Sequence, residues 1–300
     1  NEYREKFLGG QSDKTSRFEA TFSYTVKGME KLVLHMQNEL RQSEFVPVNF
    51  ELKIDEGKGS SPIKLVSKNG IEIILSGKID RVDMLEKDGE KYIRVIDYKT
   101  GKKDFSLSSI AYGLDMQMLL YLFALISDEG IYSGARPAGV LYMPSGRLKC
   151  ESARDEENDI DKIINSQYKM KGVVLRNRDV LRAMENDIQG VYIPAKLLSA
   201  DTGESDVKLD RWSSVLTEKQ FYRLREHMKE LMTNMAELLY DGDISASPLV
   251  IGKSDVCKYC SYWDVCGNVP NVRQRAADDG KEVMEAILNG EDDADGRKMD

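Results

Sequence analysis

The amino-acid sequence predicts an α/β domain, a mixed β-sheet flanked by helices. The first observation is an Asp-Gly pair between two β-rich runs, which is among the strongest short-range signals for a hairpin. The second is the order of the patterns, because strands and this hairpin alternate with helical segments. The third is size: 300 residues, 41% hydrophobic and 31% charged, suffice for a sizeable core and a well-solvated surface.

The elements follow from local patterns along the chain. A first helix is expected to end near Gln42, and the last long helix has a stop signal at Asp241-Gly242-Asp243. After the first helix we expect strands over 48–54 and 71–75, a hairpin over 77–99, a helix over 105–127 and a strand over 138–143. The last long helix is expected over 218–240. Strand, hairpin, helix and strand in succession suit one mixed sheet covered by helices.

The hairpin carries the most chemistry. If Asp88-Gly89 forms its two-residue loop, the two residue numbers of every cross-strand pair add up to one constant value. Asp80 then lies opposite Asp97, with β-carbons about 4.5–5.5 Å apart. Lys99 projects to the same face as Asp97, because side chains alternate along a strand. The register therefore predicts two carboxylates and an ammonium group above a layer of apolar pairs. On the other face Asp83 falls opposite Arg94, which indicates a surface ion pair.

Two neighbouring carboxylates repel each other unless a cation or a shared proton intervenes. Oxygen ligands without a nearby His or Cys suit Mg²⁺ or Mn²⁺. Lys99 would then stabilise charge on the phosphorus oxygens of a substrate, or position the attacking water. The plain alternative is a surface hairpin with scattered charges, because Asp-x-Lys by itself is common.

The helix expected over 105–127 is amphipathic and begins at Ser106, Ser108 or Ser109 as an N-cap. Gln117 and Tyr121 are four residues apart, so they share a face of it. This pair would hold a substrate phosphate or orient the lysine. The alternative is a half-buried aromatic residue with a polar neighbour.

Three segments carry a resemblance to a known family: Gly-Lys-Ile-Asp-Arg-Val-Asp over 77–83, Val-Ile-Asp-Tyr-Lys-Thr-Gly over 95–101, and Gly-Leu-Asp-Met-Gln-Met-Leu-Leu-Tyr over 113–121. They resemble, in order and with sensible spacing, the nuclease motifs of the RecB family within the PD-(D/E)XK superfamily. The resemblance implies a restriction-endonuclease-like fold.

The resemblance also implies roles for residues that match the motifs. Asp80 and Asp97 match the metal-binding aspartates, and Lys99 matches the catalytic lysine. Further matches are the glutamine–tyrosine pair of the motif helix, Gln117 and Tyr121, and the backbone carbonyl of Tyr98 as an additional metal ligand.

A second feature is a cysteine cluster. Three of the four cysteines, Cys257, Cys260 and Cys266, fall within ten positions. Scattered structural cysteines would not gather in this way, so shared metal or cluster ligation is the better interpretation. Thiolates suit zinc or an iron–sulfur cluster. Disulfides are the weaker interpretation, because nothing marks the chain as secreted.

The segment over 247–266 resembles the iron–sulfur staple in the B subunit of AddAB-type helicase–nucleases. In that family three late cysteines join one early cysteine around a [4Fe–4S] cluster. No cysteine precedes Gly77 here, and Cys150, the only other thiol, is interpreted as an ordinary core or strand cysteine. The cluster is therefore expected to be incomplete or absent in this chain.

A second departure concerns the metal shell. The family usually carries a histidine on a helix upstream of the hairpin. His35 lacks the glycine-led motif of that histidine and is expected to be structural, and Glu51 is only a weak substitute. These absences suggest a C-terminal piece of a larger protein, with a nuclease domain over 1–267. Residues 268–300 are expected to form an acidic, flexible tail.

Charge and hydropathy set limits. The net charge of −8 opposes nonspecific DNA binding, which usually leaves a basic footprint. Catalytic carboxylates and the acidic tail account for part of this charge. Two local positive runs remain, Lys99, Lys102 and Lys103, and later Lys169, Lys171, Arg176, Arg178 and Arg182. The first is as readily a solvated face, and for the second a solvated face is the better interpretation. The longest apolar run is far shorter than the about 20 residues of a membrane helix, and the start lacks the apolar core of a signal peptide. Cytoplasm is the expected location.

What the resemblance implies is a metal-dependent DNA exonuclease domain of a helicase–nuclease in double-strand-break repair and recombination. Its partners would be DNA and the A subunit of a heterodimer, with no membrane. The sequence contains no Walker A phosphate loop, so any motor lies elsewhere. Two alternatives stay open, a Cas4-like CRISPR nuclease and a catalytically inactive DNA-binding scaffold. Whether the chain alone is active also stays open.

Overall fold

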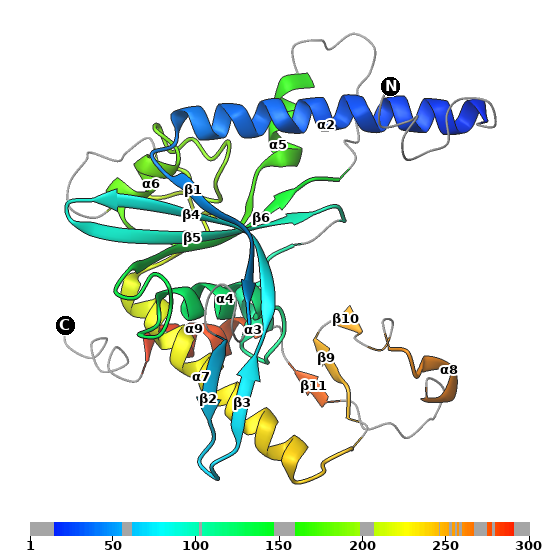
Figure 1. Cartoon of the computed structure of the whole chain (residues 1–300), viewed down its shortest axis with the longest axis vertical. Helices are drawn as coiled ribbons and strands as arrows, with labels where there is room; N and C mark the ends of the chain where they lie inside the picture. The colour runs from blue at the N-terminus through cyan, green and yellow to red at the C-terminus, as the bar shows by residue number, and fades with distance from the viewer. Residues whose placement is uncertain are drawn as a thin grey trace.

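The computed structural model describes residues 15–55, 62–101, 104–146, 160–198, 207–245, 247–251, 254–255, 257, 260–266, 275–277 and 280–290. Its centre is a six-stranded sheet in the order β1-β4-β5-β6-β7-β8 (Figure 1). The strands are β1 Val46–Ile54, β4 Gly77–Lys87, β5 Glu90–Lys99, β6 Arg136–Pro144, β7 Lys171–Leu175 and β8 Val215–Leu216. The β5–β6 and β7–β8 pairs are parallel and the others antiparallel, which confirms the predicted mixed sheet.

Helices cover both faces of this sheet (Figure 1). On one side lie α2 Ser16–Gln42, α5 Ile160–Tyr168 and α6 Arg178–Met184. On the other side lie α3 Leu107–Ile110, α4 Gln117–Ile126, α7 Glu218–Tyr240 and α9 Lys281–Asn289. The first and last predicted helices end where the sequence places their stops, at Gln42 and Tyr240.

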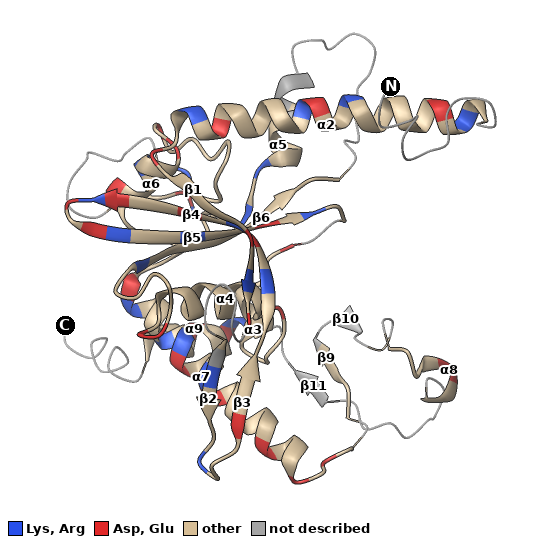
Figure 2. Ribbon diagram, in the orientation of Figure 1, with Lys and Arg blue, Asp and Glu red and all other residues tan. Residues whose placement is uncertain are grey.

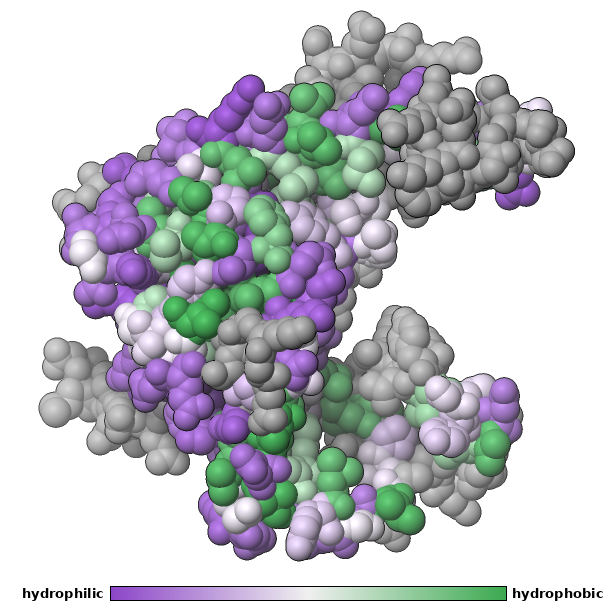
Figure 3. Space-filling model, in the orientation of Figure 1, coloured by the Kyte–Doolittle hydropathy of each residue, from purple (hydrophilic) through white to green (hydrophobic). Residues whose placement is uncertain are grey.

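Two smaller sheets accompany the central one. The hairpin of β2 Ile63–Val66 and β3 Glu72–Leu75 leads directly into β4. The strands β9 Leu249–Ile251, β10 Ser254–Asp255 and β11 Arg275–Ala277 form the other, near the short helix α8 Trp263–Cys266. The C-terminal end of α7, before this region, exposes Leu238, Leu239 and Tyr240, and apolar residues gather there in Figure 3.

The β4–β5 hairpin has the predicted register. Seven cross-strand pairs, from Arg81 opposite Ile96 to Lys87 opposite Glu90, are the partners expected for a two-residue loop. Asp88 and Gly89 adopt φ values of 54° and 79°, the left-handed conformation that a type I′ turn requires at both positions. The apolar pair of Val82 and Val95 is fully buried, so this face of the hairpin packs into the core.

The predicted helix over 105–127 is wrong as one continuous element. Ser106 caps α3, but the chain leaves the helix at Gly113 and Asp115, which have φ values of 84° and 58°, before α4 begins. Left-handed residues cannot continue a right-handed helix. Nor is α4 amphipathic, because eight of its ten residues are buried. It contacts β5 and β6 as well as α7, so it has apolar neighbours all round.

The predicted pairing of Asp83 with Arg94 is confirmed, but its predicted location on the surface is wrong. Both side chains are completely buried beneath α2. Arg81 donates two hydrogen bonds of 2.6 Å to Asp83, and Glu39 of α2 accepts from Arg94 at 2.7 Å. Two cations and two anions thus compensate one another in the interior. We call Glu39, Arg81, Asp83 and Arg94 the buried ion network.

The expected flexible tail over 268–300 also differs from the structure in part. Lys281–Asn289 forms α9, whose Met284 and Leu288 are buried in the main core. The short apolar pattern there is the buried stripe of a helix that packs on α7 and α3. Among the described residues, no helix is long and apolar enough to cross a membrane.

Candidate active site

Asp80 and Asp97 lie on neighbouring strands at the end of the hairpin away from its turn. Continuing the register one step beyond Arg81 and Ile96 places them opposite each other, on the face that carries Val82 and Val95. Both are half-buried. The Tyr98 amide donates a 2.9 Å hydrogen bond to Oδ2 of Asp80, so this carboxylate reaches across to the backbone of β5. The predicted sharing of one face therefore holds.

Lys99 extends over the same face. Its Nζ lies 2.5 Å from Oδ2 of Asp97, and 5.5 Å from the centre of the Tyr142 ring on β6. The side chains of Asp97 and Lys99 are 14% and 33% exposed, so the pair is only partly screened by water. Oδ2 of Asp97 is itself buried, with the ammonium of Lys99 against it. The contact with Lys99 is thus a close ion pair.

Tyr142 and Asp115 belong to this site, although the sequence interpretation passed over both. Tyr142 is the cross-strand partner of Asp97. Burial raises the pKa of Tyr142 to about 12, and the negative charges of Asp115 and Asp97 act in the same direction. Asp115 is half-buried and has a left-handed φ of 58°, two residues before α4 begins. The only sequence feature that could have indicated Asp115 as a site residue is its position between Gly113 and Gln117. No sequence feature indicated Tyr142.

Gln117 and Tyr121 meet as predicted. Nε2 of Gln117 donates a 2.9 Å hydrogen bond to the hydroxyl of Tyr121. Gln117 is exposed and Tyr121 is buried, so the tyrosine anchors the pair and the amide faces outward. The tyrosine ring lies against Gly77, the first residue of β4 and three residues before Asp80.

The oxygen atoms of the site are of the chemical type that binds a divalent ion. They are the carboxylate oxygens of Asp80 and Asp97, the ligand type that Mg²⁺ prefers. The amide of Tyr98 points toward β4, where it donates to Asp80. In a strand, the carbonyl of a residue points to the same edge as its amide. The carbonyl of Tyr98 is therefore also directed toward Asp80. Within the described part of the chain, no three His, Cys, Asp or Glu side chains gather to hold a metal. Two carboxylates are what Mg²⁺ needs beside substrate and water.

Glu51 does not join the carboxylates. It forms an ion pair with Lys78, and both side chains are exposed. His35 is buried between α2 and α5, where Nδ1 lies 3.2 Å from Oδ1 of Asn165 and the ring packs near Tyr168 and Tyr192. Burial lowers the pKa of His35, against the effects of Asn165 and Glu39. These surroundings agree with the structural role expected for this histidine.

Of the three clustered cysteines, Cys260 and Cys266 are free thiols. Cys260 is exposed, and Cys257 and Cys266 are partly so. Backbone hydrogen bonds from Cys260 to Cys257 and from Trp263 to Cys260 keep the segment locally turned. The neighbouring aromatic residues Tyr262 and Trp263 are 74% and 44% exposed. Cys150 lies outside the described residues.

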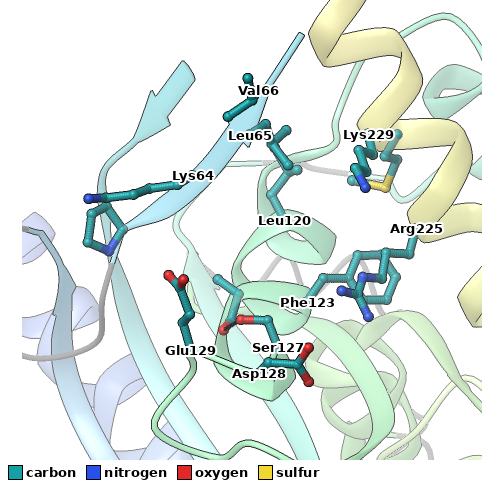
Figure 4. A pocket seen from close by; sticks show the side chains of 13 residues that line it. Lys64, Leu65, Val66, Leu120, Phe123, Ser127, Asp128, Glu129, Arg225 and Lys229 are labelled. Carbon is teal, nitrogen blue, oxygen red and sulfur yellow. Dashed lines mark hydrogen bonds between the residues drawn. The ribbon is translucent and has the colours of Figure 1, made fainter. Parts of the chain in front are cut away.

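A cavity of about 450 Å³ lies apart from these residues, between β2, α4 and α7 (Figure 4). Leu120, Phe123 and Met228 contribute apolar surface to it, and Arg225 and Lys229 reach it from α7. None of the predicted site residues lines this cavity, so the cavity is separate from the candidate active site.

Comparison with known proteins agrees with the motifs. The family model of the PD-(D/E)XK nuclease superfamily matches residues 5–267. The chain is 33% identical over 305 residues to the B subunit of the ATP-dependent helicase/deoxyribonuclease of Caldanaerobacter subterraneus subsp. tengcongensis, covering 99% of the chain and 26% of that protein. It is 33% identical to the protein of the same name from Clostridium acetobutylicum, over 89% of the chain and 24% of that protein. For Clostridium novyi the values are 34%, 87% and 23%.

The chain thus spans about a quarter of the length of the curated relatives it matches. The matched residues include the hairpin, the motif helix and the cysteine segment as far as residue 267. Because the family model covers most of the sequence and the fold has the mixed sheet that the motifs require, the chain belongs to the PD-(D/E)XK nuclease superfamily.

Proposed function

We propose that this chain is the divalent-metal-dependent DNA exonuclease domain of a helicase–nuclease. The observation that carries the proposal is the gathering of Asp80, Asp97 and Lys99 on one face at the end of the hairpin. The names of the relatives, which contain both helicase and deoxyribonuclease, support the choice of DNA as substrate.

Asp80, Asp97 and the carbonyl of Tyr98 would hold Mg²⁺ or Mn²⁺. Such an ion, when bound, polarises a phosphoryl oxygen and lowers the pKa of a water molecule. The hydrogen bond from the Tyr98 amide fixes the orientation of Asp80 before any ligand arrives. This preorganisation matters because a carboxylate that must first be reoriented loses part of its binding free energy.

Lys99 would place positive charge beside the phosphodiester as negative charge develops on its oxygens. Its ammonium is confined between the carboxylate of Asp97 and the ring of Tyr142, so it is already directed over the site. The exposed amide of Gln117 would donate to a phosphate oxygen, while the buried Tyr121 holds that amide in place.

The wider context is part of the proposal. The relatives are named as one part of a helicase–nuclease, which implies a partner that we take to be the A subunit of a heterodimer. The motor would feed DNA to this site. The role would then be double-strand-break repair and recombination in the cytoplasm. Cys257, Cys260 and Cys266 would supply three of the four ligands of a [4Fe–4S] cluster, whose fourth ligand is not among the described cysteines.

The test is cleavage of a labelled single-stranded oligonucleotide by the 300-residue chain, with Mg²⁺, with Mn²⁺ and with EDTA. Asp97→Asn and Lys99→Ala should each lower the rate about 100-fold or more, since each removes a charge at the reacting phosphate. Glu86→Gln is the matched control, because Glu86 is an exposed carboxylate on β4 near the turn.

Three results decide the proposal. Metal-dependent cleavage that is lost in Asp97→Asn and Lys99→Ala but kept in Glu86→Gln supports it. Unchanged rates in both site variants contradict the chemistry. Tight DNA binding without metal-dependent cleavage contradicts the nuclease and favours the inactive scaffold.

A further inference from the structure

We propose that Lys171 on β7 binds the phosphodiester backbone of the single-stranded nucleic acid beside the cleavage site. The inference rests on the proposed nuclease function and adds a substrate contact outside the three nuclease motifs. In the sequence Lys171 belongs to the later of the two positive runs. The order of strands in the sheet gives it a specific place.

The register connects Lys171 to the carboxylates step by step. Asp97 on β5 pairs with Tyr142 on β6, and Tyr142 pairs with Lys171 on β7. Paired residues in a sheet project to the same face. Asp97, Tyr142 and Lys171 therefore form a row across three strands, perpendicular to the strand direction, and the carboxylate of Asp80 borders it where it accepts from the Tyr98 amide. With strands about 4.8 Å apart, the Cα atoms of Asp97 and Lys171 are about 10 Å from each other.

Independent contacts place these side chains on one face. The ammonium of Lys99 lies over the ring of Tyr142, and the Phe105 ring packs 6.2 Å from the same ring. The residue before Phe105 is Asp104, whose Oδ1 lies 2.5 Å from Nζ of Lys171. Lys171 thus extends toward the segment that covers Tyr142, and not toward the buried ion network on the opposite face.

The row has the charge and exposure that a phosphate backbone requires. Lys99 lies over the ring of Tyr142, and Lys171 is the cross-strand partner of Tyr142, so a nucleic-acid strand held at the carboxylates meets one cation at the reacting phosphate and another farther along. The side chains of Lys171 and Asp104 are 42% and 68% exposed, so a phosphate can reach the lysine. Elsewhere, positive and negative residues are interspersed along α2 and α7 (Figure 2), which agrees with the absence of an overall basic footprint.

A purely structural role for Lys171 makes the opposite prediction about its partner. If the ion pair serves only to fasten the segment after Lys99 onto β7, then removing either partner has the same effect. If Lys171 binds phosphate, Asp104 competes with the substrate for its ammonium. Removing the carboxylate of Asp104 then leaves DNA affinity unchanged or raises it, whereas removing Lys171 lowers it.

The experiment measures binding of a fluorescent single-stranded oligonucleotide by anisotropy, in EDTA, across a range of salt concentrations. The variants are Lys171→Ala, Lys171→Arg, Asp104→Asn and, as the matched control, Lys91→Ala, an exposed lysine near the turn of the hairpin. We expect Lys171→Ala to weaken binding about three- to tenfold and to reduce the salt slope by about 0.7, the value for one phosphate on a single strand. Lys171→Arg and Asp104→Asn should bind at least as tightly as the parent.

The inference is overturned if Lys171→Ala binds like the parent, if Asp104→Asn weakens binding as much as Lys171→Ala does, or if Lys91→Ala has the same effect. Circular dichroism verifies that each variant folds. The cleavage assay separates this inference from the proposed function. A parent that cleaves through Asp97 but binds independently of Lys171 contradicts only the inference, whereas a parent that neither binds nor cleaves contradicts the function.

Discussion

The ring of Tyr121 occupies the space that a side chain at Gly77 would fill. A β-carbon on Gly77 would overlap the hydroxyl and two ring carbons of Tyr121. The glycine that opens the first motif is therefore required by the tyrosine that closes the third. Two segments that are separate in the sequence thus depend on one close contact, which sets the position of α4 relative to β4.

Replacing Gly77 by alanine should move Tyr121 and release Gln117, because overpacking at a close contact costs about 1–3 kcal/mol and displaces the more mobile partner. We expect cleavage to fall about tenfold or more while the chain stays folded. Gly28→Ala is the matched control: Gly28 lies in α2, away from the three motifs, and a β-carbon there meets nothing within 4 Å. Equal cleavage by the two variants, measured with the oligonucleotide assay, would show that the contact does not matter.

Local signals predicted much of the fold. The hairpin register follows from a two-residue turn and the alternation of apolar residues, both of which are properties of neighbouring residues. The hydrogen bond between Gln117 and Tyr121 needs only helical spacing. The continuous helix over 105–127 was wrong because its apolar pattern runs across both α3 and α4, and the left-handed residues Gly113 and Asp115 that separate them leave little trace in the pattern.

Relationships between distant segments were beyond these signals. The Asp83–Arg94 pair was predicted, but its burial depends on Glu39, which α2 brings from far earlier in the chain. Likewise, Tyr142 joins the site only because β6 lies beside β5. The order of strands in a sheet is set by the whole fold, so no window of sequence contains it.

The buried ion network should be sensitive to the loss of any one charge. Asp83→Asn leaves Arg81 and Arg94 with Glu39 as the only buried carboxylate in the network, and breaking a buried pair costs about 3–5 kcal/mol. Urea denaturation should show this loss in the free energy of unfolding. Glu44→Gln is the control, because it breaks only the exposed pair with Lys87 and should cost about 0–1 kcal/mol. Similar losses in the two variants would contradict a special role for the network.

The same carboxylate makes stability depend on acid. Burial by itself raises the pKa of Asp83, but the charges of Arg94 and Arg81 more than offset it, so its pKa lies below the ordinary value. The contribution of Asp83 to stability is therefore complete above the unfolded pKa of about 3.9 and is lost as pH falls below that value. Denaturation curves recorded between pH 5 and pH 2.5 should show a shallower decline for Asp83→Asn than for the parent. Parallel declines would contradict the assignment to Asp83.

His35 should contribute a separate pH dependence near neutrality. Burial lowers its pKa in the folded state, so the unfolded chain binds a proton at a pH where the folded chain does not. Stability from the neutral ring is therefore present above the unfolded pKa of about 6.5 and declines as pH falls below it. His35→Gln should flatten the decline measured by thermal unfolding between pH 7 and pH 5. His227→Gln, which changes the only other histidine, tests whether the decline belongs to His35.

The cysteine segment should bind iron incompletely in this chain. A [4Fe–4S] cluster takes four thiolates, and the described cysteines supply three, on a segment where Cys260 is exposed to solvent. We expect iron and sulfide analysis after anaerobic reconstitution to give fewer than four of each per chain. Four irons and four sulfides would contradict this expectation. If that complement then disappears in Cys150→Ser but persists in a control variant away from the cluster, such as Ser213→Ala, the fourth ligand would be Cys150, and the interpretation of that residue as an ordinary core or strand cysteine would be wrong.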